Sequence, residues 1–232
     1  MDLSLPALAL VDPASAAAAA VLVAIWWATG WIIEHPPTRR QSVARLMEGY
    51  RRAWMAEMVG RQQRIFDAAI VDSLRQGTAF FASACLIALG GGVALIGNAD
   101  RLARVADDLS LAVDTGMPVE WRLVLVLLLL ADALLRFLWS NRLFGYCAVL
   151  MGAVPNDPED PAARPAAAMA AEINITAARS FNRGLRSIYF ALAALTGLAG
   201  PVALAIATLA AAAILLRREF ASDSRRAIVA GR

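Results

Sequence analysis

Residues 121–139 read WRLVLVLLLLADALLRFLW, and this stretch decides the fold class. Its two terminal tryptophans lie eighteen residues apart, which corresponds to roughly 27 Å of α-helix. Tryptophan side chains favour the two membrane–water interfaces, so the pair indicates a helix that crosses the hydrocarbon core of a bilayer. The stretch therefore predicts a membrane protein built from α-helices.

Three further apolar runs extend this prediction to the whole chain. Of the 232 residues, 59% are hydrophobic and 18% are charged, whereas soluble domains usually carry about 25% charge. We therefore expect an all-α, polytopic membrane protein that forms a single membrane domain over residues 1–232, with four transmembrane helices. The expected spans cover about residues 13–33, 77–97, 121–140 and 188–216.

The last run is the least regular, because Gly200-Pro201 lies inside its 29 residues. A single span needs only about 20 residues. Two arrangements are therefore open. The run forms either one long, tilted and kinked helix or a pair of segments that breaks at the proline and re-enters the membrane.

Two arginine-bearing segments separate the runs. Residues 38–76, with a bend near Gly60, and residues 164–187 have apolar positions three or four residues apart, which predicts two amphipathic cytoplasmic helices. Residues 98–120 form the expected extracytoplasmic segment. The positive-inside rule then places the N-terminus outside the cytoplasm, in a bacterial inner membrane. A tail with five arginines conflicts with this orientation unless the last run is re-entrant: Arg217, Arg218, Arg225, Arg226 and Arg232.

The sequence also indicates a parallel tandem repeat. Residues 73–77 (SLRQG) resemble residues 180–184 (SFNRG), and in the same register Gly90 falls on Gly197. Each half would then contain a span, a basic cytoplasmic helix and a second span. Chance matches in a biased composition are the alternative.

One carboxylate lies in an unusual place. Asp132 is two residues beyond the midpoint between the bracketing tryptophans, where a charge costs about 2.5–3.5 kcal/mol on insertion scales. Arg136 follows at i+4 and can pair with it. We therefore predict an intramembrane polar site at Asp132 and Arg136, with Asn141 and Arg142 lining its inner end. A structural ion pair between helices is the alternative interpretation.

Several short motifs resemble the DUF599 family of predicted membrane proteins of unknown function. They are YRRAWM at 50–55, FFAS at 80–83, NRGLR at 182–186, YFALA at 189–193 and RREF at 217–220. The resemblance covers most of residues 40–222. It implies the same membrane topology and supplies no catalytic residues.

The sequence argues against several classes of chemistry. The chain has one histidine, His35, which stands directly before two prolines. No second histidine is present to complete a histidine-rich metal cluster or to serve in a Ser-His triad in place of His35. The motifs GxSxG, HExxH, GxGxxG and the P-loop do not occur. We expect no enzyme activity, no catalytic residues, no cofactor and no metal. The arginines flank apolar runs and form no stripe on a soluble fold, so we expect no nucleic-acid partner.

Two functions remain as hypotheses. The first is an oligomeric transport or channel-like protein with its polar site around Asp132 and Arg136. The second is a structural or accessory protein whose arginine-rich helices bind anionic lipid headgroups or a membrane complex. Expected partners are the lipid bilayer, anionic lipid, and further copies of the chain or other subunits. Candidate lipid or partner contacts are Arg51, Arg52, Arg75, Asn182, Arg183 and Arg186.

Overall fold

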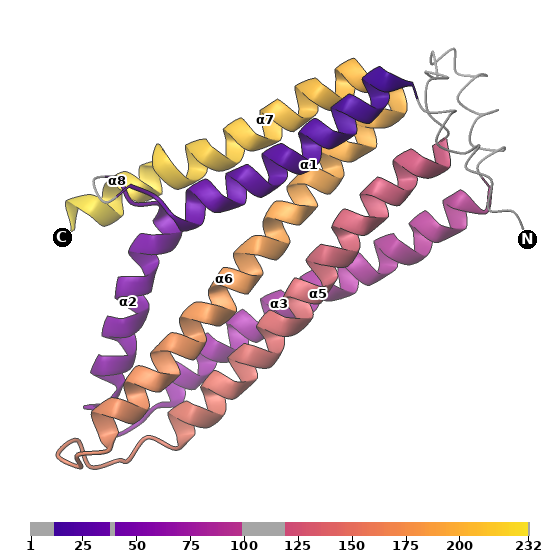
Figure 1. Cartoon of the computed structure of the whole chain (residues 1–232). Coiled ribbons are helices and arrows are strands. Elements are labelled where there is room, and N and C mark those ends of the chain that lie inside the picture. Colours follow the sequence, from indigo (N-terminus) through magenta and orange to yellow (C-terminus); the bar gives the residue numbers. More distant parts are fainter. Residues whose placement is uncertain (1–11, 38–39, 99–118, 232) are drawn as a thin grey trace, which may run out of the picture.

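Long α-helices make up the protein. The computed structural model describes residues 12–37, 40–98 and 119–231, so most of the predicted extracytoplasmic segment 98–120 lies outside the described residues. Figure 1 shows the helices running lengthwise through an elongated molecule. The helices are α1 (Pro13–Glu34), α2 (Val43–Met58), α3 (Ile65–Ile96), α5 (Val119–Gly152), α6 (Ala163–Leu195), the 3₁₀ helix η2 (Thr196–Ala199), α7 (Pro201–Phe220) and α8 (Asp223–Ala230).

Four of these helices are long and apolar enough to cross a membrane, as the sequence predicted. They are α1, α3, α5 and a helical segment that begins with α7 at Pro201. We call the end of the molecule that holds α2 the basal end. The opposite end, where α1, α5 and α7 begin, is the apical end (Figure 1).

The last apolar run is divided between two helices. Gly200 has a φ of 112°, a conformation that favours glycine, and Pro201 occupies the first turn of α7. Residues 188–216 are therefore not one span, which corrects that boundary. They form the end of α6, η2 and most of α7. The break at Gly200-Pro201, left open by the sequence, is the arrangement in the structure.

α6 and α7 form a hairpin whose turn lies at the apical end. Gly197 and Pro201 border the same cavity there as Ser15, near the start of α1. α7 then returns towards the basal end, where the backbone N–H of Ala44 donates to Glu219 at 3.0 Å. The end of α7 therefore lies beside the start of α2.

The predicted amphipathic segments differ from the observed helices in their ends. Residues 38–76 do not form one helix, because α2 ends at Met58 and α3 begins at Ile65, with Gly60 in the turn between them. α3 then runs unbroken into the second apolar run. α6 likewise joins the predicted helix 164–187 to the start of the last apolar run. The directions of the helices agree with the predicted parallel repeat. α1 and α5 run from the apical to the basal end, and α3 and α6 run from the basal to the apical end (Figure 1).

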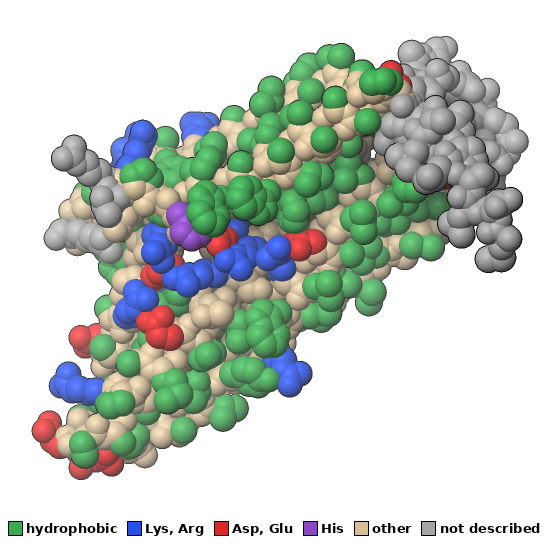
Figure 2. Space-filling model, viewed as in Figure 1, with side chains coloured by type: hydrophobic (Ala, Val, Ile, Leu, Met, Phe, Trp, Pro, Cys, Tyr) green, Lys and Arg blue, Asp and Glu red, His purple; other side chains and the backbone are tan. Residues whose placement is uncertain are grey.

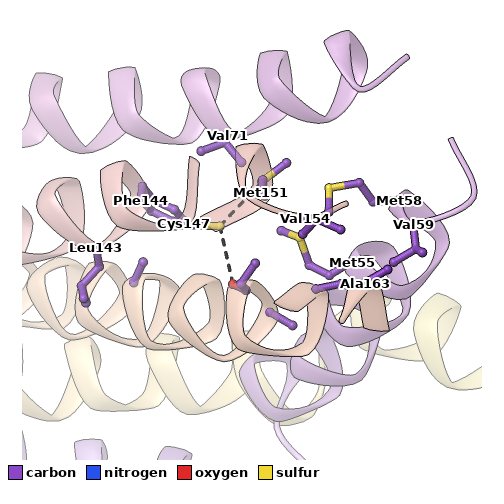
Figure 3. Packing of buried hydrophobic residues seen from close by; sticks show 14 residues of the cluster. Met55, Met58, Val59, Val71, Leu143, Phe144, Cys147, Met151, Val154 and Ala163 are labelled. Carbon is purple, nitrogen blue, oxygen red and sulfur yellow. Dashed lines mark hydrogen bonds between the residues drawn. The ribbon is translucent and has the colours of Figure 1, made fainter. Parts of the chain in front are cut away.

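The basal end has a core of its own, made from α2, α3, α5 and α6. Figure 3 shows Met55 and Met58 of α2 in one cluster with Cys147 and Met151 of α5. Cys147 lies at its centre and donates to the carbonyl oxygen of Ala170 at 3.5 Å. The α6 side of the cluster is built mainly from alanines, whose small size lets helices pack closely: Ala163, Ala167, Ala170, Ala171 and Ala177.

α5 and α6 also pack closely at the level of Gly184. An added Cβ at Gly184 would lie 2.8 Å from the ring of Phe137. That ring belongs to an aromatic cluster with Phe81 and Phe181, whose ring centroids lie 5.4 Å from that of Phe137 in both cases. The missing side chain of Gly184 therefore makes room for the fully buried Phe137.

The hairpin predicts that the two chain ends lie on opposite sides of the membrane. We expect an impermeant maleimide to label only one of the variants Ala14→Cys and Ala230→Cys in intact cells or spheroplasts, and the other only after permeabilisation. The native Cys85 and Cys147 are buried and should give a low background. Labelling of both variants from the same side would contradict the hairpin.

Packing at Gly184 predicts a large effect from a single methyl group. Gly184→Ala should lower the free energy of unfolding in detergent micelles by about 1–3 kcal/mol, because the methyl group overlaps Phe137. Gly145→Ala on α5 is the matched control, since an added Cβ there meets nothing within 4 Å. Equal stability of the two variants, measured by denaturant titration, would contradict the proposed packing.

Candidate functional site

Glu34, the last residue of α1, joins that helix to α6. Arg183 Nε donates to Glu34 Oε1 at 2.8 Å, and a second Arg183 N–H reaches Oε2. Arg186 donates to Oε1 as well. Arg186 is 7% exposed, so this pair is shielded from solvent far more than a typical surface ion pair. The carboxylate therefore holds two arginines that are adjacent on the surface of one helix.

Asp132 and Arg136 pair as predicted from their spacing. Arg136 Nε donates to Asp132 Oδ2 at 2.6 Å. The hydroxyl of Ser187, on α6, donates to the same oxygen at 2.5 Å and accepts from the indole N–H of Trp26 at 3.3 Å. Ser187 is fully buried. It therefore connects α5 to α1 through α6, with α6 between the two.

Aromatic side chains of α1 form the other wall. The rings of Trp27 and Trp31 stack at a centroid distance of 5.7 Å, and Trp31 stacks on His35 at 4.1 Å. Trp27 and Trp31 remain 65% and 55% exposed. These large exposed indoles on a spanning helix are typical of an interface between membrane and water.

These groups enclose a cavity of about 270 Å³, which we call the arginine pocket. Trp26, Trp27 and Trp31 line it from α1, together with His35 directly after that helix. Arg136, Arg183 and Arg186 line it from α5 and α6. Figure 2 shows a row of basic and acidic side chains on the face between α1 and α5, with hydrophobic side chains on both sides. The pocket is therefore amphiphilic and opens on the surface of the helical bundle.

Arginines outnumber the carboxylates that bond to them in the arginine pocket. Three arginines bond to two carboxylates, Glu34 and Asp132, and a third carboxylate, Glu219, acts on Arg186 only through its charge. Each guanidinium carries five N–H donors, and the carboxylates engage one on Arg136, two on Arg183 and one on Arg186. Donors therefore remain for a further anion, and paired arginines favour phosphate or carboxylate oxygens.

Two residues predicted for this site lie elsewhere. Asn141 donates to the carbonyl oxygen of Arg75 and to Thr78 Oγ1, both at 3.1 Å, and so joins α5 to α3. Arg142 is exposed and donates to the hydroxyl of Tyr146 at 2.5 Å. Neither borders the arginine pocket.

The predicted lipid or partner contacts lie in different parts of the molecule. Arg183 and Arg186 line the arginine pocket, and Asn182 next to them does not. Arg51 is half-buried and donates to Asn174 inside the basal end. Arg75 is exposed and lines a separate cavity of about 350 Å³ between α3 and the end of α5.

Arg52 pairs with Glu172 on the surface of the basal end. Arg52 Nε donates to Glu172 Oε1 at 2.6 Å and an Arg52 Nη donates to Oε2 at 3.3 Å. The hydrogen bond from Arg52 lowers the pKa of Glu172, and the same bond raises the pKa of Arg52. This arginine is thus occupied by an acid of α6, which helps to hold α2 against that helix.

Three functional residues were missed from the sequence: Trp26, Glu34 and Ser187. Glu34 precedes His35 and two prolines in a stretch with no pattern that predicts an ion pair, and Ser187 carries no local pattern either. Their partners lie 149, 152, 161 and 55 residues away in the chain. A spacing rule for neighbours on one helix cannot detect such contacts.

Comparisons with known proteins give one match. The model of the DUF599 family, described as "Protein of unknown function", matches residues 17–224. This range contains every residue of the arginine pocket. None of the curated proteins matches the chain, and none of the solved structures does.

The hydrogen bonds of Ser187 predict that its hydroxyl stabilises the bundle. Ser187→Ala should lower the free energy of unfolding in micelles by about 1–3 kcal/mol, because it removes one of the two partners of Asp132, which keeps Arg136, and leaves the indole N–H of Trp26 without its partner. The matched control is Ser140→Ala, since Ser140 is equally buried but bonds only to the carbonyl oxygen of Ala177. A smaller loss for Ser187→Ala than for the control would contradict this role.

Proposed function

This chain belongs to the DUF599 family, and we propose that it is a membrane-embedded binding protein whose arginine pocket holds an anionic group. One observation carries the proposal. Arg136, Arg183 and Arg186 converge on one cavity beside the indoles of α1. The proposal describes a binding protein and not an enzyme.

The chemistry of the pocket favours an oxyanion such as a phosphate. Guanidinium groups bind phosphate oxygens through paired N–H donors. The guanidinium N–H groups that the carboxylates leave free remain to be bonded, and a low-dielectric surrounding makes such a bond to an anion stronger than in water. The shared ligand chemistry is thus a phosphate oxyanion, supplied by a lipid headgroup or by a free anion.

The proposed location is a bacterial inner membrane, with the N-terminus outside and the basal end in the cytoplasm. The return of α7 supports this orientation, because it brings Arg217 and Arg218 to the same end as Glu34 and α2. The tail that conflicted with the positive-inside rule then agrees with it. The arginine pocket would face the anionic headgroups of the cytoplasmic leaflet.

Contacts within the basal end reduce the number of arginines that we propose as lipid contacts. Arg51 and Arg52 are engaged by Asn174 and Glu172 of α6, which favours a role in holding the basal helices together. Arg183 and Arg186 lie on α6 where it meets the end of α1, and they become the proposed lipid contacts.

Transport is the second candidate, because the Asp132 side chain is 28% exposed. Towards the apical end the next cavity is lined by alanine, valine, leucine and tryptophan side chains. A polar path would therefore need a second copy of the chain to complete it, as in the proposed oligomer. Transport predicts that Asp132→Asn changes the flux of an anion into proteoliposomes, and an unchanged flux would contradict it.

Removing the pocket arginines tests the main proposal. The tryptophans of the pocket report binding by their fluorescence, and the probes are inorganic phosphate and dihexanoyl phosphatidate, with dihexanoyl phosphatidylcholine as the zwitterionic comparison. We expect the phosphatidate signal to weaken at least tenfold in Arg183→Gln/Arg186→Gln and to weaken with added salt. Arg142→Gln is the matched control, since Arg142 lies outside the pocket.

A second variant distinguishes loss of phosphatidate binding from loss of folding. The triple variant Glu34→Gln/Arg183→Gln/Arg186→Gln leaves no lone charge at the joint between α1 and α6. It should fold and still bind phosphatidate at least tenfold more weakly than the wild type. Binding of phosphatidate by this variant at the wild-type affinity would overturn the proposal.

Glu34→Gln alone should have the opposite effect. Removing this carboxylate releases Arg183 and Arg186 and raises the net charge of the pocket by one. We expect binding of dihexanoyl phosphatidate to become about tenfold tighter, which corresponds to roughly 1.4 kcal/mol. Weaker binding, measured by the same fluorescence titration, would show that Glu34 orients the arginines and does not compete with the ligand.

A further inference from the structure

We infer that the arginine pocket is the headgroup end of a site for one anionic phospholipid, one of whose acyl chains lies in an apolar groove between α1 and α5. The inference rests on the proposed function of the pocket and adds the class of ligand. It follows from three observations: the continuity of the groove with the pocket, its length and its lining.

The groove begins where the arginine pocket ends. A cavity of about 600 Å³ shares Trp26 and Trp27 with the arginine pocket and continues towards the apical end. A third cavity, of about 250 Å³, shares Ala19 and Leu125 with it and reaches Pro201. One continuous depression thus runs from the charged side chains to the apical end of the molecule.

Small side chains on α1 create the groove. Ala19, Ala20 and Ala24 line it from α1, and Leu125 lines it from α5. Ser187 of α6 bonds to Trp26 on one side and Asp132 on the other, so α6 holds α1 and α5 apart at the lower end of the groove. The spacing of the walls is therefore a property of the fold.

The groove is long enough for a chain that spans one leaflet. From Trp27 to Ala19 the rise of α1 is roughly 12 Å, and from Trp27 to Ser15 it is roughly 18 Å. Half of the hydrocarbon core of a bilayer is about 15 Å thick. A chain that starts beside the arginines would thus reach the middle of the membrane within the groove.

Charge decides between a lipid and the other possible occupants. An apolar helix from a second copy could cover the groove but would bring no anion to the free guanidinium N–H groups at its basal end. A free phosphate would satisfy the arginines and leave the groove to exchanging lipid. An anionic phospholipid fills both parts with complementary chemistry, since its phosphate meets the guanidinium groups and its chain meets alanine and tryptophan.

Filling the groove tests the inference. The variant Ala20→Phe/Ala24→Phe places two rings in the groove without touching the arginines. The matched control is Ala17→Phe, an exposed position of α1 that does not line the groove. Each protein is purified in detergent after incubation with phosphatidylglycerol and phosphatidylcholine of equal chain length, and retained lipid is counted by native mass spectrometry. Binding of dihexanoyl phosphatidate is measured beside it.

We expect the wild type and Ala17→Phe to retain one phosphatidylglycerol per chain and at least tenfold less phosphatidylcholine. Ala20→Phe/Ala24→Phe should lose at least tenfold of the retained phosphatidylglycerol and keep its affinity for dihexanoyl phosphatidate. Unchanged retention by the filled variant would overturn the inference and leave the headgroup pocket intact. Loss of a dimer without any retained lipid would assign the groove to a second copy and also overturn it. Absence of phosphatidate binding in the wild type would instead contradict the proposed function.

Discussion

The carboxylate of Glu34 lies between Arg183 and Arg186, and the relative position of the helices in the membrane depends on this contact. It fixes the basal end of α1 against α6, while Ser187, one residue beyond Arg186, reaches both Trp26 and Asp132. Charges that would be costly in hydrocarbon are thus gathered at one level, where each has a partner. The hairpin of α6 and α7 and the groove along α1 are both arranged around this level.

Much of the fold was predictable because hydropathy reports directly on the membrane. The four long apolar helices were expected, and so was the possibility of a break at Gly200-Pro201. Hydropathy indicates whether a residue lies in lipid or in water, and it does not indicate where a helix begins or ends. α3 therefore runs unbroken from Ile65 to Ile96 although its surroundings change near Arg75, because no residue in that stretch prevents the helix from continuing.

The candidate site was predictable only where it is local. Asp132 and Arg136 are neighbours on one helix face, so their spacing was sufficient. Arg183 and Arg186 were predicted as lipid or partner contacts from their charge, but their partner Glu34 lies on another helix about 150 residues earlier in the chain and carries no local signal. Asn141 was misplaced for a related reason, since the side to which a polar residue turns depends on which helix packs against it, here α3.

The unbroken length of α6 has a mechanical consequence. One end of this helix is held in the basal core through Asn174 and Glu172, and further along the same rod lie Arg183, Arg186 and Ser187. The proline of α6, Pro165, lies in its first turn, and an α-helix without an internal proline or a bulge is stiff along its axis. A rotation imposed on the basal helices would therefore turn the arginines relative to the indoles of α1. A movement of the basal end would in this way change the shape of a pocket near the membrane surface.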